Sequence, residues 1–414
     1  MRVFQGQRLR AADRYNPSRL SSSQPGATTD ATPSLAQTLP VDAVSATLVG
    51  RVWLPGELGG PTPVVVRGDD LVDVSGLAPT LSALLELDDP VAAVRAAPSR
   101  SVGRVADVLA RHGGAHLLAP CDLQPIKAAG VTFAASTIER VIEERARGDP
   151  ARAAAVRTEV IRIVGGDLSK IKPGSPESMR LKQLLVAQGV WSQYLEVAIG
   201  PDAEVFTKGP PMAAVGTGAD IGVHPDSSWN NPEPEVVLAV NSRGQVRGAA
   251  LGNDVNLRDF EGRSALLLGK AKDNNGSCAI GPFVRLFDSG YDLDAVRGAV
   301  VRLDVRGDDG FVLEGSSSMA QISRDPLDLV AQTIGPNHQY PDGLMLFCGT
   351  MFAPVEDRDE AGAGFTHKPG DRVTITSDRL GALVNRVDRS DRIAPWTFGL
   401  GDLMRSLAAR GLLR

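Results

Sequence analysis

The feature that most constrains the fold of this chain is a change of sequence character near residue 203. From about Ala203 to Arg386 the sequence consists of short β-type runs, separated by turns rich in Gly, Pro, Asn and Asp. Examples of these runs are EVVLAV, GAALGNDV, AVVRLDV, GLMLFCGT and DRVTITS. Runs of this length and spacing predict a mainly antiparallel or mixed β core that is fed by long loops.

The whole sequence divides into three parts. Residues 1–40 are rich in Arg, Ser, Pro and Thr and lack the apolar stretch of a secretory signal, so we interpret them as a disordered extension; a transit peptide or an upstream start codon are the alternatives. Residues 41–118 combine β-type runs with one helical stretch and predict a small α/β N-terminal domain. A larger domain is expected over residues 119–405, with a helical insertion, rich in Ala, Glu and Arg, at about 140–195.

Composition excludes several classes of function. With 414 residues, a net charge of −5 and no basic stripe, the chain is not expected to bind nucleic acid. No run approaches 18 apolar residues, so we expect no membrane partner. The three cysteines, Cys121, Cys278 and Cys348, lie far apart and fit neither a disulfide framework nor a zinc motif, which is typical of a cytoplasmic protein.

Two glutamates stand at the start of the apolar run in WNNPEPEVVLAV. In an extended chain Glu233 and Glu235 point to the same face, about 7 Å apart, so their charges repel unless solvent or a cation offsets them. Asp254 follows nineteen residues after Glu235, in GNDVNLRD. Because this set contains no His or Cys, a bound cation would be Mg²⁺, Mn²⁺ or Ca²⁺ rather than Zn²⁺. A solvated, metal-free pair remains the alternative at this stage.

Other motifs for catalysis do not fit. GTGADIG and GRSALLLGK have the wrong spacing for nucleotide-binding loops, and the chain has neither a G-x-S-x-G nor an H-E-x-x-H motif. The oxygen ligands therefore carry most of the functional signal.

The oxygen ligands belong to a longer pattern of seven short sequence blocks. EVFTK, NPEPEVVLAV, GNDVNLRDFEG, KDNNGSCAIGPFV, GLMLFCGT, KPGDRVTI and GALVNRV follow one another over roughly residues 125–390. In order and spacing they resemble the fumarylacetoacetate hydrolase family. The resemblance implies an α+β chain whose catalytic domain is that family's mixed β-roll. It also implies that Glu233, Glu235 and Asp254 hold Mg²⁺, with Mn²⁺ or Ca²⁺ as alternatives.

The same resemblance implies roles for further residues. Arg258 and Thr350 match positions that would bind the carboxylate of a 2-oxo acid, and Lys208 matches a lysine of the substrate site. Lys272 matches a lysine that, beside a cation, could have a lowered pKa and act as a base. A surface salt bridge is the alternative for each of them, most of all for Lys208, because lysine is usually solvated.

Departures from the family pattern point to the reaction type. Family hydrolases activate water with a histidine–glutamate pair in a lid segment, which here reads GVTFAASTIE. Glu139 is kept, but Ser136 stands at the histidine position and Phe133 at a tyrosine position. Glu261 stands where the hydrolases have glutamine, so we expect Phe133 and Glu261 to contact the substrate. Because serine cannot hold a proton near neutral pH as imidazole does, this lid is not built to activate water.

This pattern resembles a branch of the family that dehydrates 2-keto-3-deoxy sugar acids. It implies an Mg²⁺-dependent dehydratase that converts 2-keto-3-deoxy-D-pentonate to 2-oxoglutarate semialdehyde through an enolate and loss of the carbon-4 hydroxyl. We expect Glu139 and Lys272 to transfer the two protons and Ser136 to position a hydroxyl or a water.

Two other functions stay open from the sequence. One is an acylpyruvate or diketo sugar acid hydrolase, and the other is a catalytically idle binding protein on the same fold. For the leading hypothesis the partner is a small 2-oxo sugar acid. The family resemblance implies a homodimer or homotetramer.

Overall fold

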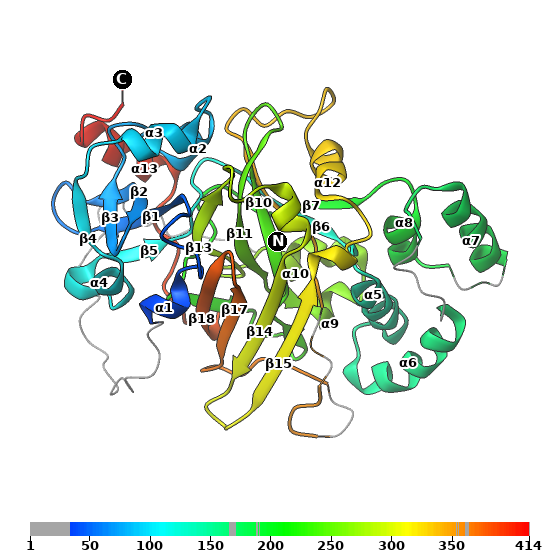
Figure 1. Cartoon of the computed structure of the whole chain (residues 1–414). Helices are drawn as coiled ribbons and strands as arrows, with labels where there is room; N and C mark the ends of the chain where they lie inside the picture. Colours follow the sequence, from blue (N-terminus) through cyan, green and yellow to red (C-terminus); the bar gives the residue numbers. More distant parts are fainter. Residues whose placement is uncertain are drawn as a thin grey trace, which may run out of the picture. The chain divides into compact units, whose positions relative to one another are not determined.

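Figure 1 shows a computed structural model of the chain. The structure describes residues 34–164, 171–187, 189, 191–352, 354, 356–360 and 364–413. The expected disordered extension, residues 1–40, falls mostly outside this part. Its described end contains a short helix, α1 (Leu35–Thr38), whose first turn is capped by the Ser34 hydroxyl. None of the described helices combines the length and the apolar character that crossing a bilayer requires.

Among the described residues, eleven strands form one large sheet, in which all neighbours are antiparallel except β16 and β6. β5 (His116–Leu118) pairs with β1 beside the main path of this sheet. In order along that path the strands are β4 (Ser101–Arg104), β3 (Asp70–Asp73), β2 (Gly60–Arg67), β1 (Leu48–Leu54), β13 (Cys278–Leu286), β11 (Val246–Asp254), β10 (Pro234–Val240), β16 (Leu344–Phe347), β6 (Ile126–Gly130) and β7 (Glu204–Gly209).

A second sheet has five described strands, and its edge pair β18 and β8 is parallel. Two further short strands, β9 and β12, pair with each other. The bounds in the order of the second sheet are β15 (Val312–Ser318), β14 (Val300–Arg306), β17 (Arg372–Ser377), β18 (Gly381–Arg389) and β8 (Asp220–Val223), and those of the short pair are β9 (Asn230–Asn231) and β12 (Asn256–Leu257).

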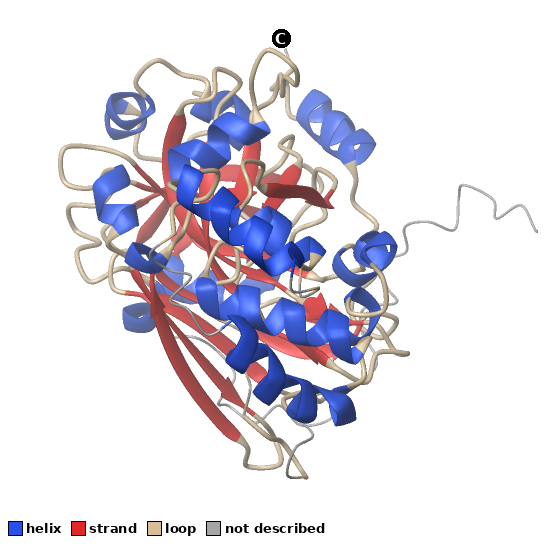
Figure 2. Cartoon of the chain, turned by 90° about the vertical axis from the view of Figure 1, so that its right-hand side faces the viewer, coloured by secondary structure: helices blue, strands red, loops and turns tan. Residues whose placement is uncertain are grey.

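The described α-helices form two groups. Four consecutive helices occupy the region of the expected insertion, and Figure 2 looks onto that side of the molecule, where helices lie in front of the strands. These four are α5 (Ala134–Ala146), α6 (Pro150–Val164), α7 (Pro176–Ala187) and α8 (Gln193–Ile199). The others are α2 (Leu81–Leu85), α3 (Pro90–Ala96), α4 (Val105–Leu109), α9 (Arg258–Glu261), α10 (Leu268–Lys272), α11 (Leu293–Arg297), α12 (Pro326–Thr333) and α13 (Leu400–Ala409).

Strand β10 shows why its sequence is apolar without alternation. On one face Val236 and Leu238 belong to a buried cluster that includes residues of β14 and β17 in the second sheet. On the other face Val237 packs in a cluster with Leu84 of α2 and Val94 of α3. A strand that is covered on both faces reads as a continuous apolar run. This sandwich fixes β10, and with it the side chains at its first residues.

The mixture of two sheets and several helices confirms the predicted α+β class. The N-terminal strand β1 pairs directly with β13, at Leu48 with Arg285 and at Val49 with Val284. The residues before 118 and those after it therefore share one sheet. The predicted domain boundaries at residues 40 and 118 stay predictions.

Candidate active site and metal centre

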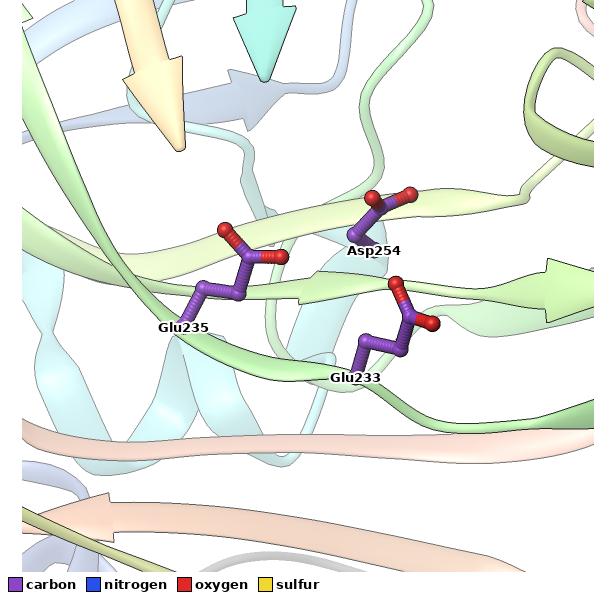
Figure 3. Close-up of side chains that lie close together, drawn as sticks. All are labelled: Glu233, Glu235 and Asp254. Atoms are coloured by element: carbon purple, nitrogen blue, oxygen red, sulfur yellow. The ribbon is translucent and has the colours of Figure 1, made fainter. Parts of the chain in front are cut away.

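Three carboxylates meet at one end of β10 and β11. Figure 3 shows the side chains of Glu233, Glu235 and Asp254 turned toward one another, and one oxygen from each lies within 4.8 Å of the other two. Their side chains are buried, with at most 2% of each residue exposed. Solvent therefore does not offset the charge of the two glutamates, and the solvated alternative is wrong.

The pairing of the two strands brings this trio together. Because β10 and β11 are antiparallel with Glu235 opposite Gly252, the end of β11 lies beside the start of β10. The backbone N–H of Asp254 donates to the Glu233 carbonyl at 3.0 Å. A Cβ on Gly252 would lie 2.3 Å from the Phe347 ring, so a glycine is required where β16 packs behind the site.

Two buried lysines neutralise part of this charge. The Lys272 ammonium, at the end of α10, lies 2.5 Å from a Glu233 oxygen and 2.9 Å from an Asp254 oxygen. The Lys208 ammonium, on β7, lies 2.7 Å from the other Asp254 oxygen and also donates to the Val255 carbonyl. Lys208 is fully buried, so the solvated alternative for this residue is wrong.

The Lys272 pKa is raised. Burial alone would lower it, but the charges of Asp254, Glu233 and Glu261 outweigh burial and stabilise the ammonium form. The predicted lowering of this pKa depends on a cation that compensates the charge of the same carboxylates.

Glu235 differs from its neighbours because only neutral groups contact it among the described residues. Its carboxylate accepts a hydrogen bond from the Gly349 N–H at 2.6 Å and one from the Thr350 hydroxyl at 3.3 Å. Burial, Asp254 and Glu233 together raise the Glu235 pKa well above its ordinary value. Three buried carboxylates, one of them without a charged partner, form a donor set that fits a hard divalent cation such as Mg²⁺.

Arg140 connects the helical region to this trio, and the sequence did not indicate it. From α5 its guanidinium contacts Glu233, and it lies 2.7 Å from Glu143 and 2.8 Å from Glu261. Burial lowers its pKa, but the three carboxylates raise it well above the ordinary value. The charge of Arg140 is therefore permanent and is shared among three buried acids.

Arg258 lies in the same charged network. Its guanidinium donates to Glu143 at 2.6 Å and to Glu139 at 3.0 Å, and it stacks over the Trp229 ring at 4.3 Å. Arg157 of α6 donates to both oxygens of the Glu139 carboxylate, at 2.9 Å to Oε2, the oxygen that also accepts from Arg258. Burial raises the Glu139 pKa, but these two arginines outweigh it and the pKa is lowered. Glu139 thus lies in a salt-bridge environment, which disfavours proton donation.

Of the remaining predicted residues, Phe133 and Ser136 lie at the start of α5, and Thr350 lies at the metal trio. Phe133 precedes α5 and is buried, and the Ser136 hydroxyl donates to the Phe133 carbonyl at 2.8 Å within the first turn. Thr350 is brought to the metal trio through its bond to Glu235. The structure therefore groups Lys208, Lys272 and Thr350 with the trio, and groups Glu139 with Arg258. Among the described residues, no hydrogen bond joins Ser136 to either group.

A small cavity of about 120 Å³ lies next to this network. Its lining residues come mainly from α8, β7, α9 and α10: Gln193, Tyr194, Val197, Glu204, Glu261, Ala265 and Leu268. Burial raises the pKa of Glu261 to about 7, against the opposing charge of Arg140. Burial also raises the Glu204 pKa, although Arg140 and Lys272 oppose it. The cavity therefore presents two carboxyl groups that hold protons more readily than usual.

Glu204 is a second residue that the sequence did not indicate. Strand alternation places Glu204 and Phe206 on one face of β7, and the Lys272 ammonium lies 5.7 Å from the centre of the Phe206 ring. This alternation was the available signal, because Glu204 begins the EVFTK block. Arg140 had no such signal, since a helix reading STIERVIEERARG predicts solvated charges.

Residues 189–388 match the family model of the fumarylacetoacetate (FAA) hydrolase C-terminal domain, a range that contains the carboxylate trio, Lys208 and Lys272. Residues 189–388 are therefore similar to the C-terminal domain of the fumarylacetoacetate hydrolase family.

Two relatives with similar sequences are named as dehydratases. The chain is 31% identical over 193 residues to 2-dehydro-3-deoxy-D-arabinonate dehydratase of Saccharolobus solfataricus, which covers 46% of this chain and 60% of the relative. It is 30% identical over 194 residues to a Haloferax volcanii protein named "Probable 2-keto-3-deoxyxylonate dehydratase", which covers 47% of this chain and 63% of that one. The matched region thus spans less than two thirds of either relative.

Solved structures confirm the predicted fold. A 2-keto-3-deoxy-D-arabinonate dehydratase in its apo form has a TM-score of 0.58 and 20% identity, covering 83% of this chain and 99% of that chain. The same enzyme complexed with magnesium and 2,5-dioxopentanoate gives a TM-score of 0.58 at 21% identity with the same coverage. A fumarylacetoacetate hydrolase from Exiguobacterium antarcticum has a TM-score of 0.52 at 15% identity and covers 83% of this chain and 100% of that chain. Dehydratases and hydrolases therefore share this fold.

Proposed function

We propose that this chain is a metal-dependent hydro-lyase that dehydrates a 2-keto-3-deoxy sugar acid. The substrate is 2-keto-3-deoxy-D-pentonate and the product is 2-oxoglutarate semialdehyde. The observation that carries the proposal is the buried trio of Glu233, Glu235 and Asp254, together with a nearby cavity lined by two carboxyl groups whose pKa is raised by burial. The two dehydratase relatives support the choice of reaction.

The trio would hold Mg²⁺, with Mn²⁺ or Ca²⁺ as substitutes of the same ligand preference. Such a cation supplies Lewis acidity for the 2-oxo acid group, which favours loss of a proton from carbon 3. Glu235 is the natural principal ligand, because its contacts in the described part of the chain are neutral donors. Thr350 holds that carboxylate in place, and we propose that it also meets the substrate carboxylate.

Lys272 is our candidate for the group that accepts the carbon-3 proton. Its ammonium form is stabilised by Glu233 and Asp254, at 2.5 and 2.9 Å. Lys272 would lose much of that stabilisation when the two carboxylates neutralise a divalent cation instead, because their charge is then compensated. Lys208 remains paired with Asp254 and fixes its orientation.

Glu204 is our candidate for the acid that protonates the leaving hydroxyl of carbon 4. In the described part of the chain its carboxyl group has no hydrogen-bond or ion-pair partner, it lines the cavity, and burial raises its pKa. A group in this state can give up a proton to a leaving group. Glu139 was the sequence-based candidate for such a transfer, and its two arginine partners favour the ionised form instead.

The reaction balances without an external reagent. The carbon-3 proton goes to Lys272, and the carbon-4 hydroxyl leaves as water with the proton of Glu204. Tautomerisation of the resulting unsaturated acid gives the semialdehyde. Arg258, Phe133 and Glu261 are proposed to line the substrate site. Hydrolysis of a carbon–carbon bond would instead need a water-activating base, and Ser136 cannot act as one.

A product assay tests the proposal. The protein, supplied with Mg²⁺, is incubated with the D and L forms of 2-keto-3-deoxypentonate, and 2-oxoglutarate semialdehyde and pyruvate are measured separately. We expect semialdehyde from one isomer. Pyruvate would identify a cleaving enzyme, and no product together with no Mg²⁺-linked rise in melting temperature would identify a catalytically idle protein.

We further propose that the enzyme acts in the cytoplasm as a homodimer or homotetramer. Three buried, unpaired cysteines suit a reducing compartment. Light scattering coupled to size-exclusion chromatography measures the assembly directly, and a monomeric mass would contradict this part of the proposal.

A further inference from the structure

A second, larger pocket of about 480 Å³ lies at the turn between α5 and α6. No residue of the metal trio or of the Glu204 cavity lines it. Its lining residues are Glu144, Arg145, Arg147, Arg152, Val156, Trp191 and Ser192. The guanidinium groups of Arg147 and Arg152 outnumber the single carboxylate of Glu144, so this pocket carries positive charge, whereas the chain as a whole is acidic with a net charge of −5.

Arg147 has an unfavourable backbone conformation for its residue type. It caps the C-terminus of α5 with φ +55°, in the left-handed region, and is followed by Gly148 at φ +68°. Glycine adopts this conformation without steric cost, whereas a residue with a Cβ loses about 1 kcal/mol there. An arginine at this position is therefore not explained by local stability, and its guanidinium is the feature that a glycine would lack.

Two of the pocket arginines, Arg147 and Arg152, are not neutralised by the described part of the chain. Arg147 and Arg152 are exposed, and neither side chain forms an ion pair or hydrogen bond with a described residue. The nearby acid Glu196 is already engaged, since it accepts from Lys182 at 2.5 Å and from the Trp191 indole at 3.2 Å. Positive charge thus faces a concave space that has one aromatic wall.

The turn between α5 and α6 also contacts helix α9, which carries the site residues Arg258 and Glu261. A Cβ added to Gly148 would lie 2.4 Å from the Asp259 carbonyl, and one added to Gly262 would lie 2.9 Å from the Gly148 Cα. The α5–α6 turn is therefore packed closely against α9. A ligand that fixes Arg147 would fix this turn on α9 as well.

We propose that this pocket binds a small multivalent oxyanion, either a polycarboxylate or a phosphate. Guanidinium groups form paired hydrogen bonds with carboxylate and phosphate oxygens, which makes arginine the preferred residue for such ligands. The site is separate from the proposed metal centre, so the proposal stands whether or not the chain is a dehydratase.

Binding of citrate and of inorganic phosphate to the metal-free full-length protein tests this proposal. Isothermal titration at constant ionic strength is expected to give saturable binding of one or both probes. Binding of citrate alone would identify a polycarboxylate site, and binding of phosphate alone would identify a phosphate site. The variant Arg147→Gly is expected to weaken the affinity at least tenfold without lowering the melting temperature, because glycine suits the left-handed turn.

Arg111→Gly is the matched control. Arg111 is also exposed and left-handed, with φ +57°, and lies outside the pocket, so its replacement removes the same charge from the same backbone conformation. We expect it to leave the affinity unchanged. Absence of saturable binding to the wild-type chain, or an equal loss of affinity in both variants, would overturn the proposal.

Discussion

At the scale of single residues, the pKa values of glutamates are shifted in opposite directions because their neighbours differ. Glu139 lies between two arginines, which lower its pKa, whereas burial raises the pKa of Glu204. Glu235 has only neutral donors among its described contacts, so its charge is the one that a cation is most needed to offset. These environments, rather than the residue type, decide the three proposed roles: Glu204 as proton donor, Glu139 as structural anchor and Glu235 as metal ligand.

Replacing Glu204 by Gln tests the proton donor. We expect turnover to fall by about 10²- to 10⁴-fold, the usual contribution of general acid catalysis, with Mg²⁺ binding retained. In the wild type the protonated carboxyl is lost as the pH rises through its raised pKa, so the rate should decline toward alkaline pH. A pH–rate profile of the wild type that matches the profile of the variant would exclude Glu204.

Replacing Glu139 by Gln tests the anchor. Because Arg258 and Arg157 would lose their shared acid, we expect a loss of about 3 kcal/mol in the free energy of unfolding at pH 7. The Glu139 pKa is lowered by folding, so its contribution is present above the ordinary carboxyl pKa and disappears as the pH falls through the lowered value. Denaturant unfolding at pH 7 and pH 3 measures both effects.

The control for this variant is Glu57→Gln. Glu57 is exposed, so its replacement should change the free energy of unfolding by less than about 0.5 kcal/mol. Equal stability of the Glu139 variant and the wild type at pH 7 would contradict the anchoring role.

At the scale of elements, helix α5 connects the helical region to the metal centre. Its residues Glu139, Arg140 and Glu143 face α9, and Arg140 reaches Glu233 as well. These charges are buried even though the helix sequence is typical of a solvated surface. Its packing against α9 and against the start of β10, which are distant in sequence, decides their burial.

Arg140→Met tests this connection. Three buried carboxylates would lose a partner, so we expect a loss of at least about 3 kcal/mol in the free energy of unfolding without added metal. Mg²⁺ should then raise the melting temperature more than in the wild type, because Glu233 no longer binds a guanidinium. Thermal unfolding with and without MgCl₂ measures this difference. For Arg140→Lys, which keeps the charge, the rise in melting temperature caused by Mg²⁺ should lie between the rise in the wild type and the rise in Arg140→Met. An Mg²⁺ effect no larger than in the wild type would argue against the connection.

The elements also show what the sequence could predict. The E-x-E pair with Asp254 was found because strand alternation and the family spacing fix it locally, and the β-type runs predicted the β core of the α+β class that the family resemblance implied. The burial of Lys208 and the contacts of Arg140 depend on which strands and helices become neighbours. Periodicity in one segment does not contain that information, so neither the partners of Glu139 nor the Glu204 cavity could be predicted from it.

At the scale of the whole described unit, both sides of β10 depend on distant parts of the chain. Leu84 and Val94, from the region before residue 118, share a buried cluster with Val237 of β10. Strand β1 extends the same sheet at β13. The N-terminal region therefore completes the core behind the metal centre.

This shared core predicts cooperative unfolding. Scanning calorimetry should show one transition, and Leu84→Ala should destabilise the whole unit by about 2 to 5 kcal/mol, because Leu84 is fully buried. A second transition that Mg²⁺ stabilises and that Leu84→Ala leaves unchanged would contradict this prediction. It would support an independent domain that begins near residue 119.

The central claim is that the carboxylate trio supports a metal-dependent dehydration. The most direct measurement follows 2-oxoglutarate semialdehyde by NMR in metal-free protein, before and after addition of Mg²⁺, in the wild type and in Glu235→Gln. The variant should stay folded without metal, because Glu235 has no charged partner among the described residues. We predict that Mg²⁺ switches on semialdehyde formation in the wild type and not in the variant. Equal product with and without Mg²⁺, or formation of pyruvate instead, would contradict the account.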